Sequence, residues 1–317
     1  MAIKNLKTFL RVFLSFGLII LLIYLMKDDL EKITSSLLNA NKVLFFLSFL
    51  IYILVLVVIS FRLKWIMKVQ RGRITFKEAV TLNFIGHFFS SFLPTAIGGD
   101  VFRAYFIYQK TGNKIGSYTA VFVDRFIGLI TTVFIASSAI IFVKGAVPAK
   151  VKGTVIVLLV ISFLASLIFL NRRLAKSLKI LRDILKFLKL HTKIETVYNA
   201  INIYKNRKYI IVKSLILTLI CQIVSFYLIF LLSKALSINI PLKAIFFLMP
   251  LVSFMSMLPS IGGLGFREGA FIVFFGPIIT KELAFSLSLL WLGIIILTSI
   301  IGGIIYSIKG NFRIKLE

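Results

Sequence analysis

Six ionisable residues lie within or beside long apolar segments of this 317-residue chain, away from its basic loops. Charged groups are costly in hydrocarbon, so such residues line a cavity or pair with one another. A guanidinium group binds phosphate or carboxylate through parallel hydrogen bonds, and a nearby carboxylate can hold it in place or carry a proton. The sequence therefore predicts an anion-binding site made from Asp100, Arg103, Asp124, Arg125, Arg267 and Glu268.

A motif that occurs twice carries two of these arginines. Leu-Pro followed by Ile-Gly-Gly-x-x-Phe-Arg occurs in each half of the chain, with the second part at 97–103 and again at 261–267. Glycine permits tight turns and proline ends an incoming helix. We expect each copy to form a turn between two half-helices, made by Pro94, Gly98 and Gly99 in the first half and by Pro259, Gly262, Gly263 and Gly265 in the second.

The residues after each turn are placed to begin the returning half-helix. Asp100 is expected to be the N-cap of the first, with Arg103 one turn later, and for Asp100 a purely capping role and a ligand contact both stay open. In the second copy Gly265 takes the cap position and Arg267 lies in the first turn. Two helix N-termini and two guanidinium groups would then converge on one phosphate or carboxylate. Because Arg267 and Glu268 are adjacent, we expect Glu268 to pair with an arginine of the other turn.

Further polar residues recur at helical spacing before each turn, and for two of the ionisable residues a structural role stays open. For Asp124 and Arg125 a structural place at the membrane interface stays open, because residues 126–143 alone supply eighteen uncharged residues. His87 is the weakest member of the polar set, since a lone histidine in an apolar helix is commonly a packing residue. The predicted polar lining is Asn83, His87, Ser91, Ser253, Ser256 and Ser260.

The composition defines the class of protein that must position these groups. Hydrophobic residues make up 59% of the chain and the mean hydropathy is +1.02, which predicts an all-α polytopic membrane protein. The net charge of +27 comes from lysines and arginines between apolar segments, as on a cytoplasmic membrane face, so we expect no binding of nucleic acid. The single cysteine, Cys221, excludes an intrachain disulfide.

Eight apolar stretches organise the chain. Two are shorter, Ala79 to Leu93 and Leu242 to Leu258, and each runs into one of the Leu-Pro and Gly-Gly motifs. Gly/Pro-interrupted segments in corresponding positions of two halves indicate the substrate site of a transporter. The six full transmembrane spans are predicted at roughly Phe9 to Met26, Val43 to Phe61, Ser117 to Val143, Val155 to Leu170, Ile210 to Ser233 and Leu283 to Ile308.

The distribution of lysine and arginine favours re-entrant hairpins for the two short stretches. Residues 172–208 hold eleven basic and two acidic residues, and residues 62–77 hold six basic and no acidic residues, so both segments should be cytoplasmic. A complete crossing at residues 79–93 would put the first of these outside. The sequence therefore predicts two oppositely oriented re-entrant helical hairpins, an inverted repeat, with both chain termini on the cytoplasmic side of the cell membrane.

The resulting organisation is a single membrane domain over residues 1–317. The first half, residues 1–170, contains the hairpin 79–112, and the second half, residues 209–308, contains the hairpin 242–277. Between them, residues 172–208 place leucines on one face and basic residues on others. Such a basic amphipathic helix binds an anionic cytoplasmic leaflet, although a solvated connector stays open as the alternative.

The sequence lacks the common nucleotide-binding, metalloprotease and hydrolase motifs. It has no GxxxxGK[ST] loop, no HExxH, no GxSxG and no cluster of cysteine and histidine. We therefore expect no metal site, no cofactor and no enzymatic activity.

The two motif regions resemble a known family. "FSSFLPTAIGGDVFRAYFIYQKTGNKIGSYTAVFVDRFIGLI" and "LVSFMSMLPSIGGLGFREGAFIVFF" are similar to the two signature regions of the lysylphosphatidylglycerol synthase transmembrane family, a flippase-like domain also found at the front of the bacterial multiple peptide resistance factor. The resemblance implies movement of a phospholipid or polyprenyl-phosphate-linked lipid between leaflets. It carries over to the predicted turn residues and to the six ionisable residues. The cytosolic aminoacyl-transferase domain of two-domain relatives is absent, so a lysyltransferase activity is not expected.

The sequence therefore favours a flippase that binds a lipid phosphate at the meeting point of the hairpins and works by alternating access. Two other classes stay open, namely a secondary transporter of a small soluble anion and an integral membrane enzyme acting on a lipid-linked sugar. The expected partner is a membrane lipid substrate, and both a homo-oligomer and a separate lipid-modifying enzyme stay open as protein partners.

Overall fold

The computed structural model describes residues 26–93, 98–142, 203–258 and 260–309, together with residues 17, 20–22, 24 and 153. The regular secondary structure of these residues is helical, and no strand occurs among them. The all-α class predicted from the composition is therefore confirmed.

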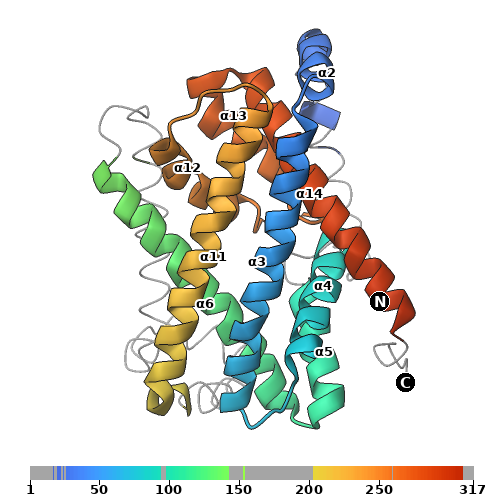
Figure 1. The fold of residues 1–317 in the computed structure, drawn as a ribbon, viewed down its shortest axis with the longest axis vertical. Helices are drawn as coiled ribbons and strands as arrows, with labels where there is room; N and C mark the ends of the chain where they lie inside the picture. The colour runs from blue at the N-terminus through green and yellow to red at the C-terminus, as the bar shows by residue number, and fades with distance from the viewer. Residues whose placement is uncertain are drawn as a thin grey trace, which may run out of the picture.

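Four long helices form the body of the molecule (Figure 1), namely α3 (Lys42–Val69), α6 (Lys114–Phe142), α11 (Lys208–Ala235) and α14 (Lys281–Ile308). Each has at least 28 residues. At 1.5 Å per residue such a helix reaches about 42 Å, which exceeds the roughly 30 Å of bilayer hydrocarbon. Within the described residues these four helices are long and apolar enough to cross a membrane. The chain is a multi-pass membrane protein.

In the described part of the chain, two pairs of shorter helices flank the predicted turns. α4 (Phe76–Phe92) is followed by α5 (Gly98–Thr111), and α12 (Leu242–Met255) is followed by α13 (Phe266–Ile279). Helices of 14 to 17 residues reach only about 21 to 26 Å, less than the hydrocarbon thickness. In Figure 1, α4 and α5 lie in the lower half of the molecule and α12 and α13 in the upper half.

Local caps define where two of these helices begin. The side chain of Asn41 accepts a hydrogen bond from the backbone N–H of Leu44 at 3.1 Å, which starts α3. Thr75 and Glu78 form a reciprocal capping box, in which the Glu78 carboxylate accepts from the Thr75 N–H at 2.7 Å and the Thr75 hydroxyl accepts from the Glu78 N–H at 3.3 Å. α4 therefore begins a few residues after α3 ends, at the same end of the molecule.

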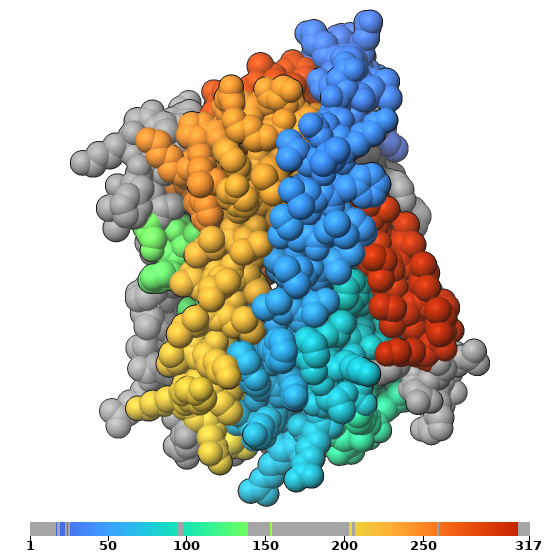
Figure 2. Space-filling model, viewed as in Figure 1, coloured from blue at the N-terminus to red at the C-terminus, as the bar shows by residue number. Residues whose placement is uncertain are grey.

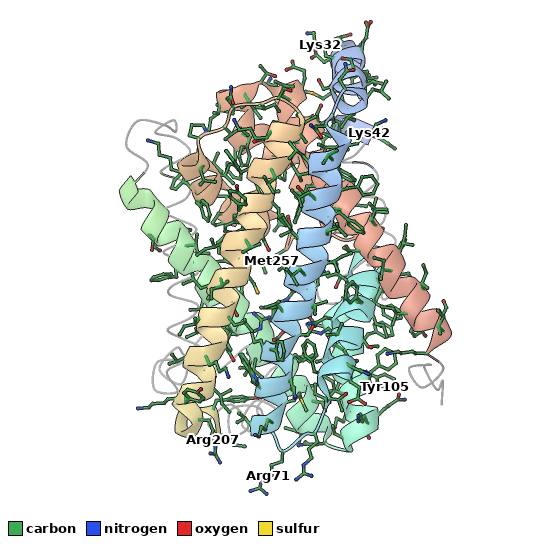
Figure 3. The ribbon with its side chains drawn as sticks, in the orientation of Figure 1. Lys32, Lys42, Arg71, Tyr105, Arg207 and Met257 are labelled. Carbon is green, nitrogen blue, oxygen red and sulfur yellow. The ribbon has the colours of Figure 1, made fainter. Side chains whose placement is uncertain are left out.

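Helices from the two halves of the chain pack against one another. α3 packs along α11, α14 packs against both α4 and α13, and α5 packs between α4 and α6. Figure 2 shows α3 and α11 side by side over one face, with α4 and α14 next to α3. Figure 3 places Arg71 and Arg207 at one end of this bundle and Lys32 and Lys42 at the other. The two pairs of short helices therefore belong to a bundle to which both halves of the chain contribute.

One helix boundary differs from the prediction in a way that matters for the site. The span predicted to end at Phe61 continues as α3 to Val69, and Arg62, placed by the sequence in a basic loop, is inside this helix and only 9% exposed. The prediction was wrong because a buried guanidinium is tolerated where a carboxylate pairs with it. No glycine or proline occurs between Arg62 and Gly72, so the sequence allowed the longer helix.

Several predicted segments lie mostly or wholly outside the described residues. These are most of the span Phe9 to Met26, the span Val155 to Leu170, and residues 172–202 of the basic amphipathic segment. At their edges the structure has η1 (Lys27–Asp29) and α2 (Leu30–Leu38), which packs on α14, and η2 (Ile203–Arg207), which precedes α11.

Candidate functional site

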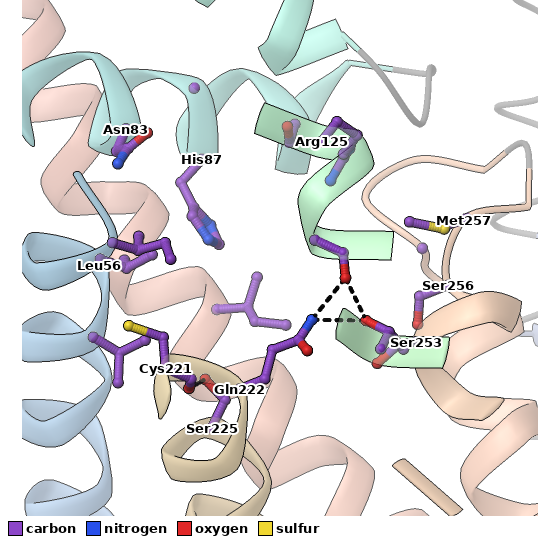
Figure 4. Close-up of a pocket in the computed structure, with 18 of the residues that line it drawn as sticks. Leu56, Asn83, His87, Arg125, Cys221, Gln222, Ser225, Ser253, Ser256 and Met257 are labelled. Atoms are coloured by element: carbon purple, nitrogen blue, oxygen red, sulfur yellow. Dashed lines mark hydrogen bonds between the residues drawn. The ribbon is translucent and has the colours of Figure 1, made fainter. Parts of the chain in front are cut away.

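A cavity of about 490 Å³ lies between the two pairs of short helices. Residues of α3, α4, α5, α6, α11, α12, α13 and α14 line it together with residues of the second turn, and Figure 4 shows part of its wall. The volume is within the range of small-molecule binding pockets, roughly 300–1,000 Å³. Four arginines contribute to the lining, namely Arg62, Arg103, Arg125 and Arg267.

Arg103 is held between two aspartates. Its Nη1 lies 3.2 Å from Oδ1 of Asp100, and its Nη2 lies 3.1 Å from Oδ2 of Asp124. The side chain crosses α4 at Gly86, where a Cβ atom would come within 2.5 Å of the Arg103 Cδ. Nε of Arg103 has no hydrogen-bond partner within the described part of the chain. Arg103 is thus the central cation of the first half, and its Nε donor is available to a ligand.

Arg62 extends the same network into α3. Its Nε lies 2.6 Å from Oδ1 of Asp124, and its Nη1 donates to the hydroxyl of Thr218 on α11 at 2.9 Å. Asp124 is only 3% exposed, so it lies inside the bundle and not at an interface with water. This carboxylate bridges two arginines and ties α3, α5 and α6 together.

Asp100 bridges two arginines as well. One carboxylate oxygen meets Arg103, and Oδ2 lies 2.8 Å from Nε of Arg125 on α6. α5 already begins at Gly98, so Asp100 lies within its first turn and the predicted N-cap position was wrong. A carboxylate in the first turn still stabilises the helix through its dipole. Asp100 therefore anchors the start of α5 to α6.

The second half holds its arginine in a different way. Nε and Nη2 of Arg267 both donate to Oε1 of Glu268, at 2.9 and 2.6 Å, and Oε2 of Glu268 accepts from the backbone N–H of Gly265 at 2.7 Å. Gly265 occupies the N-cap of α13, as expected. The prediction that Glu268 pairs with an arginine of the other turn was wrong, because the long Arg267 side chain folds back onto its neighbour. Arg267 and Glu268 form a closed, buried pair.

The glycines of the second turn bring it into contact with α4. Gly262, Gly263 and Gly265 have φ values of 57°, 80° and 84°, a backbone region that glycine adopts without strain. A Cβ atom on Gly262 would lie 3.0 Å from the carbonyl oxygen of Ser91, near the end of α4. The second turn therefore touches the last part of α4 directly.

The first turn starts α5 close to α4. Gly98 and Gly99 are the first residues of α5, and a Cβ atom on Gly99 would overlap the carbonyl oxygen of Gly86. The absence of a side chain at Gly99 thus allows the two backbones to meet. Pro94 and Pro259, the two prolines predicted to shape the turns, lie outside the described residues.

Five of the six residues predicted as a polar lining contribute to the cavity wall. The amide of Asn83 donates to the hydroxyl of Ser60 at 2.7 Å. Nε2 of His87 lies 3.1 Å from the hydroxyl of Tyr52, and no described group contacts its Nδ1 by a hydrogen bond. The five residues are Asn83, His87, Ser91, Ser253 and Ser256.

Ser260 lies elsewhere. α12 ends at Met255, so the helical spacing that linked Ser260 to the other serines does not continue to it. Its hydroxyl donates to the carbonyl oxygen of Leu258 at 3.3 Å, and the residue is fully buried outside the cavity lining. Its prediction as a lining residue is corrected accordingly.

The geometry can be set beside known proteins. The lysylphosphatidylglycerol synthase TM region family matches this chain over residues 9–303. The chain belongs to this family. It is also similar to UPF0104 membrane protein MJ1595 of Methanocaldococcus jannaschii, with 29% identity over 226 residues, which cover 66% of each chain and so just under two thirds of that relative. No solved structure matches the chain.

In this member of the family the charges around the cavity nearly cancel. Each of the three carboxylates, on Asp100, Asp124 and Glu268, is bound to at least one guanidinium group. The four arginines that line the cavity and the three carboxylates that pair with them, of which Glu268 lies behind Arg267 and outside the lining, leave one positive charge in excess. A ligand group with a single negative charge therefore complements the site.

Several lining residues were missed by the sequence reasoning. Gln222 on α11 donates to the carbonyl oxygen of Gly128 at 3.0 Å and to the hydroxyl of Thr132 at 2.7 Å. Thr218 binds Arg62, and Trp291 on α14 contacts Tyr52 with ring centroids 5.1 Å apart. No motif marks these positions, because each is a single polar or aromatic residue in an apolar span. The available signal in the sequence was that a single polar or aromatic side chain interrupts an otherwise apolar helix face at each of these positions.

The described groups of the cavity form ion pairs and hydrogen bonds. No three side chains of histidine, cysteine, aspartate or glutamate come together as a metal site in the described ranges. Cys221 lines the cavity as a free, buried thiol. What the arrangement offers chemically is recognition of an anion by several guanidinium groups.

Proposed function

We propose that the chain is a lipid transporter that moves an anionic phospholipid or a polyprenyl-phosphate-linked lipid between the two leaflets by alternating access. The observation that carries the proposal is the gathering of four arginines around one cavity of about 490 Å³ between two pairs of helices too short to span a bilayer. Guanidinium groups bind phosphate with a geometry that suits them particularly well. The acyl or prenyl chains stay in the bilayer while the headgroup crosses.

The proposed topology has six full spans and two re-entrant hairpins that form an inverted repeat. The short lengths of the four hairpin helices and their positions in opposite halves of the molecule support it (Figure 1). The end that carries Arg71 and Arg207 faces the cytoplasm, because basic residues concentrate at 64–77 and 205–213 (Figure 3). Both chain termini then lie on the cytoplasmic side of the cell membrane.

The ion network supports binding of the lipid phosphate to Arg103 in place of its contacts with Asp100 and Asp124. When phosphate binds Arg103, Asp100 keeps Arg125 and Asp124 keeps Arg62, so neither carboxylate is left unpaired. Removing the partner of a buried charge is strongly unfavourable, and this arrangement avoids that cost. Arg267 differs, because release from Glu268 would leave Glu268 with only the Gly265 N–H. Arg103 therefore binds the lipid phosphate, and Arg267 stabilises the second turn.

The contact of the second turn with the end of α4 supports alternating access. Gly262 of the second turn lies against the Ser91 backbone, and the Ser91 hydroxyl lies 2.6 Å from that of Ser299 on α14. A shift of either hairpin must break or slide this contact. Opening toward one leaflet is thus coupled to closing toward the other.

The function includes no catalysis by this chain. Its partners are the lipid substrate, the anionic cytoplasmic leaflet, and either a second copy of the chain or a separate lipid-modifying enzyme. Uptake of a soluble anion without lipid movement would favour the secondary-transporter alternative. Formation of a product from a lipid-linked sugar by the purified chain would favour the enzyme alternative.

Binding can be tested with a reporter that lies in the cavity. The chain has two tryptophans, and only Trp291 lines the cavity, so a Trp65→Phe variant isolates its fluorescence. Addition of anionic lipid should change the Trp291 emission with saturation, whereas zwitterionic lipid with the same acyl chains should not. An unchanged emission at saturating anionic lipid, or an equal response to both lipids, would contradict the proposal.

A further inference from the structure

One side of the cavity presents hydrogen-bond acceptors. The hydroxyls of Ser225, Ser253 and Ser256 all line the cavity, and each donates its proton to a helix carbonyl oxygen four residues earlier, at 2.8, 2.9 and 2.7 Å. A hydroxyl has one proton to donate and two lone pairs. These oxygens are therefore left to accept hydrogen bonds from an occupant. Figure 4 shows Ser225 on α11 and the other two serines at α12.

The amide of Gln222 adds an acceptor whose orientation is fixed. Both hydrogen bonds of its Nε2 go to oxygen atoms, the carbonyl oxygen of Gly128 and the hydroxyl oxygen of Thr132. That hydroxyl donates its own proton to the same carbonyl, so it can only accept from Gln222. A flipped amide would set two carbonyl oxygens against each other. Oε1 of Gln222, a buried atom at the cavity wall, has no partner within the described part of the chain, and such an acceptor is costly until a donor reaches it.

Helix α4 contributes a further acceptor, whose orientation is fixed by hydrogen bonds in the same way. The Ser60 hydroxyl donates to the carbonyl oxygen of Leu56 at 2.8 Å, so it must accept from the Nδ2 of Asn83 at 2.7 Å. The carbonyl oxygen of the Asn83 amide is then the acceptor end of this side chain, which lines the cavity. Acceptors therefore come from α4, α11 and α12.

Hydroxyl and ammonium groups can both donate hydrogen bonds to such acceptors. The net charge around the cavity distinguishes between these two kinds of donor. All three carboxylates are already bound to guanidinium groups, and the site has one positive charge in excess among the described residues. A phosphodiester neutralises that excess. An ammonium on the same headgroup would restore a net positive charge in a partly dehydrated cavity, which is unfavourable.

We infer that the headgroup carried through the cavity is a neutral polyol attached to its phosphate, such as glycerol, inositol or a sugar, and that amine-bearing headgroups are disfavoured. The guanidinium of Arg103 takes the phosphate and the acceptors of Gln222 and the serines take the hydroxyl protons. This inference rests on the proposed function and adds the chemical class of the substrate.

The test compares headgroups on identical acyl chains, with the purified full chain and Trp291 fluorescence as the measure of binding. Phosphatidylmethanol carries the same single charge as phosphatidylglycerol but no hydroxyl, and aminoacylated phosphatidylglycerol adds an ammonium to the same headgroup. Phosphatidylglycerol should bind about tenfold more tightly than phosphatidylmethanol, as expected for one or two net hydrogen bonds. Aminoacylated phosphatidylglycerol should bind more weakly than phosphatidylglycerol. A phosphatidylinositol arm distinguishes a ring polyol from glycerol by which of the two binds more tightly.

Gln222→Met keeps the side-chain volume and removes the acceptor. It should bring the ratio of phosphatidylglycerol to phosphatidylmethanol affinity toward one, whereas Gln109→Met, at an exposed position on α5, should leave the ratio unchanged. Equal wild-type affinities for these two lipids, or binding of the aminoacylated lipid as tight as that of phosphatidylglycerol, would overturn the inference, even where the variant fails to fold. Failure of every anionic lipid to bind would instead contradict the proposed function.

Discussion

Arg62 and Asp124 form a buried ion pair with 2.6 Å between Nε and Oδ1, although they lie 62 residues apart on α3 and α6. The second oxygen of Asp124 binds Arg103. Arg62 therefore keeps Asp124 paired whenever Arg103 is engaged elsewhere. This relationship makes Arg103 available to a ligand inside a membrane protein, where an unpaired carboxylate would be costly.

Replacing Arg62 should affect both stability and binding. Arg62→Gln leaves Asp124 with Arg103 as its only charged partner, so the free energy of unfolding should fall by roughly 1.5–3 kcal/mol, as for the loss of a hydrogen bond to a charged group. Arg103 should then release Asp124 to bind phosphate less readily. The measurement is the midpoint of thermal unfolding in detergent together with anionic-lipid affinity. Arg73→Gln, at an exposed position between α3 and α4, is the matched control and should change neither. Normal stability of Arg62→Gln would mean that Asp124 does not depend on this pair.

The two arginines of the repeated motif should respond differently to replacement by lysine. Arg103→Lys keeps the charge but removes the fork of donors, so anionic-lipid affinity should fall roughly tenfold to a hundredfold while thermal stability changes little. Arg267→Lys should mainly lower thermal stability, because two donors to Glu268 are lost in a buried pair. Equal losses of affinity for both variants would show instead that the arginines share the phosphate as a unit.

The close contact of α4 and α5 can be tested with a single methyl group. Gly99→Ala places a Cβ on the carbonyl oxygen of Gly86 and should lower the thermal stability markedly. Gly269→Ala on α13 is the control, because no atom outside its own helix lies within 4 Å of the added Cβ, and alanine favours a helix over glycine. If Gly99→Ala were as stable as Gly269→Ala, the helices would not be in backbone contact at this point.

Topology can be read from cysteine labelling. In a Cys221→Ser background, cysteines at the exposed positions Gln109 and Arg207 should be labelled only from the cytoplasmic side, and one at the exposed position Ser237 only from outside. A cysteine at Lys186, in the basic segment, should also react only from inside. External labelling at position 109 or 186 would contradict the hairpin arrangement.

The sequence predicted some features of the site well, for physical reasons. Three glycines gather at 262–265 shortly after a Leu-Pro pair, and glycine adopts positive φ without strain. The position of the second turn and the cap at Gly265 therefore followed from residue type. Arg103 and Asp124 could be selected because charge is rare in hydrocarbon.

Other features of the site depend on side-chain direction in three dimensions. The Arg267–Glu268 pair was missed, because a long arginine can fold back to a neighbour that helical projection places elsewhere. Arg62 and Gln222 were missed because a pattern of apolar residues identifies a span but does not tell which polar side chain another helix will meet. Only the packing of α3, α6 and α11 brings these residues to the cavity.

The central claim is that Arg103 binds the phosphate of a lipid that crosses the bilayer. The most direct measurement is the leaflet-to-leaflet movement of headgroup-labelled anionic lipid in proteoliposomes, followed by chemical quenching of the outer leaflet. The wild type should move anionic lipid faster than protein-free vesicles and faster than a neutral-headgroup lipid, and Arg103→Lys should lose most of that acceleration while remaining folded. An unchanged rate in Arg103→Lys, or equal acceleration of the neutral lipid, would contradict the claim.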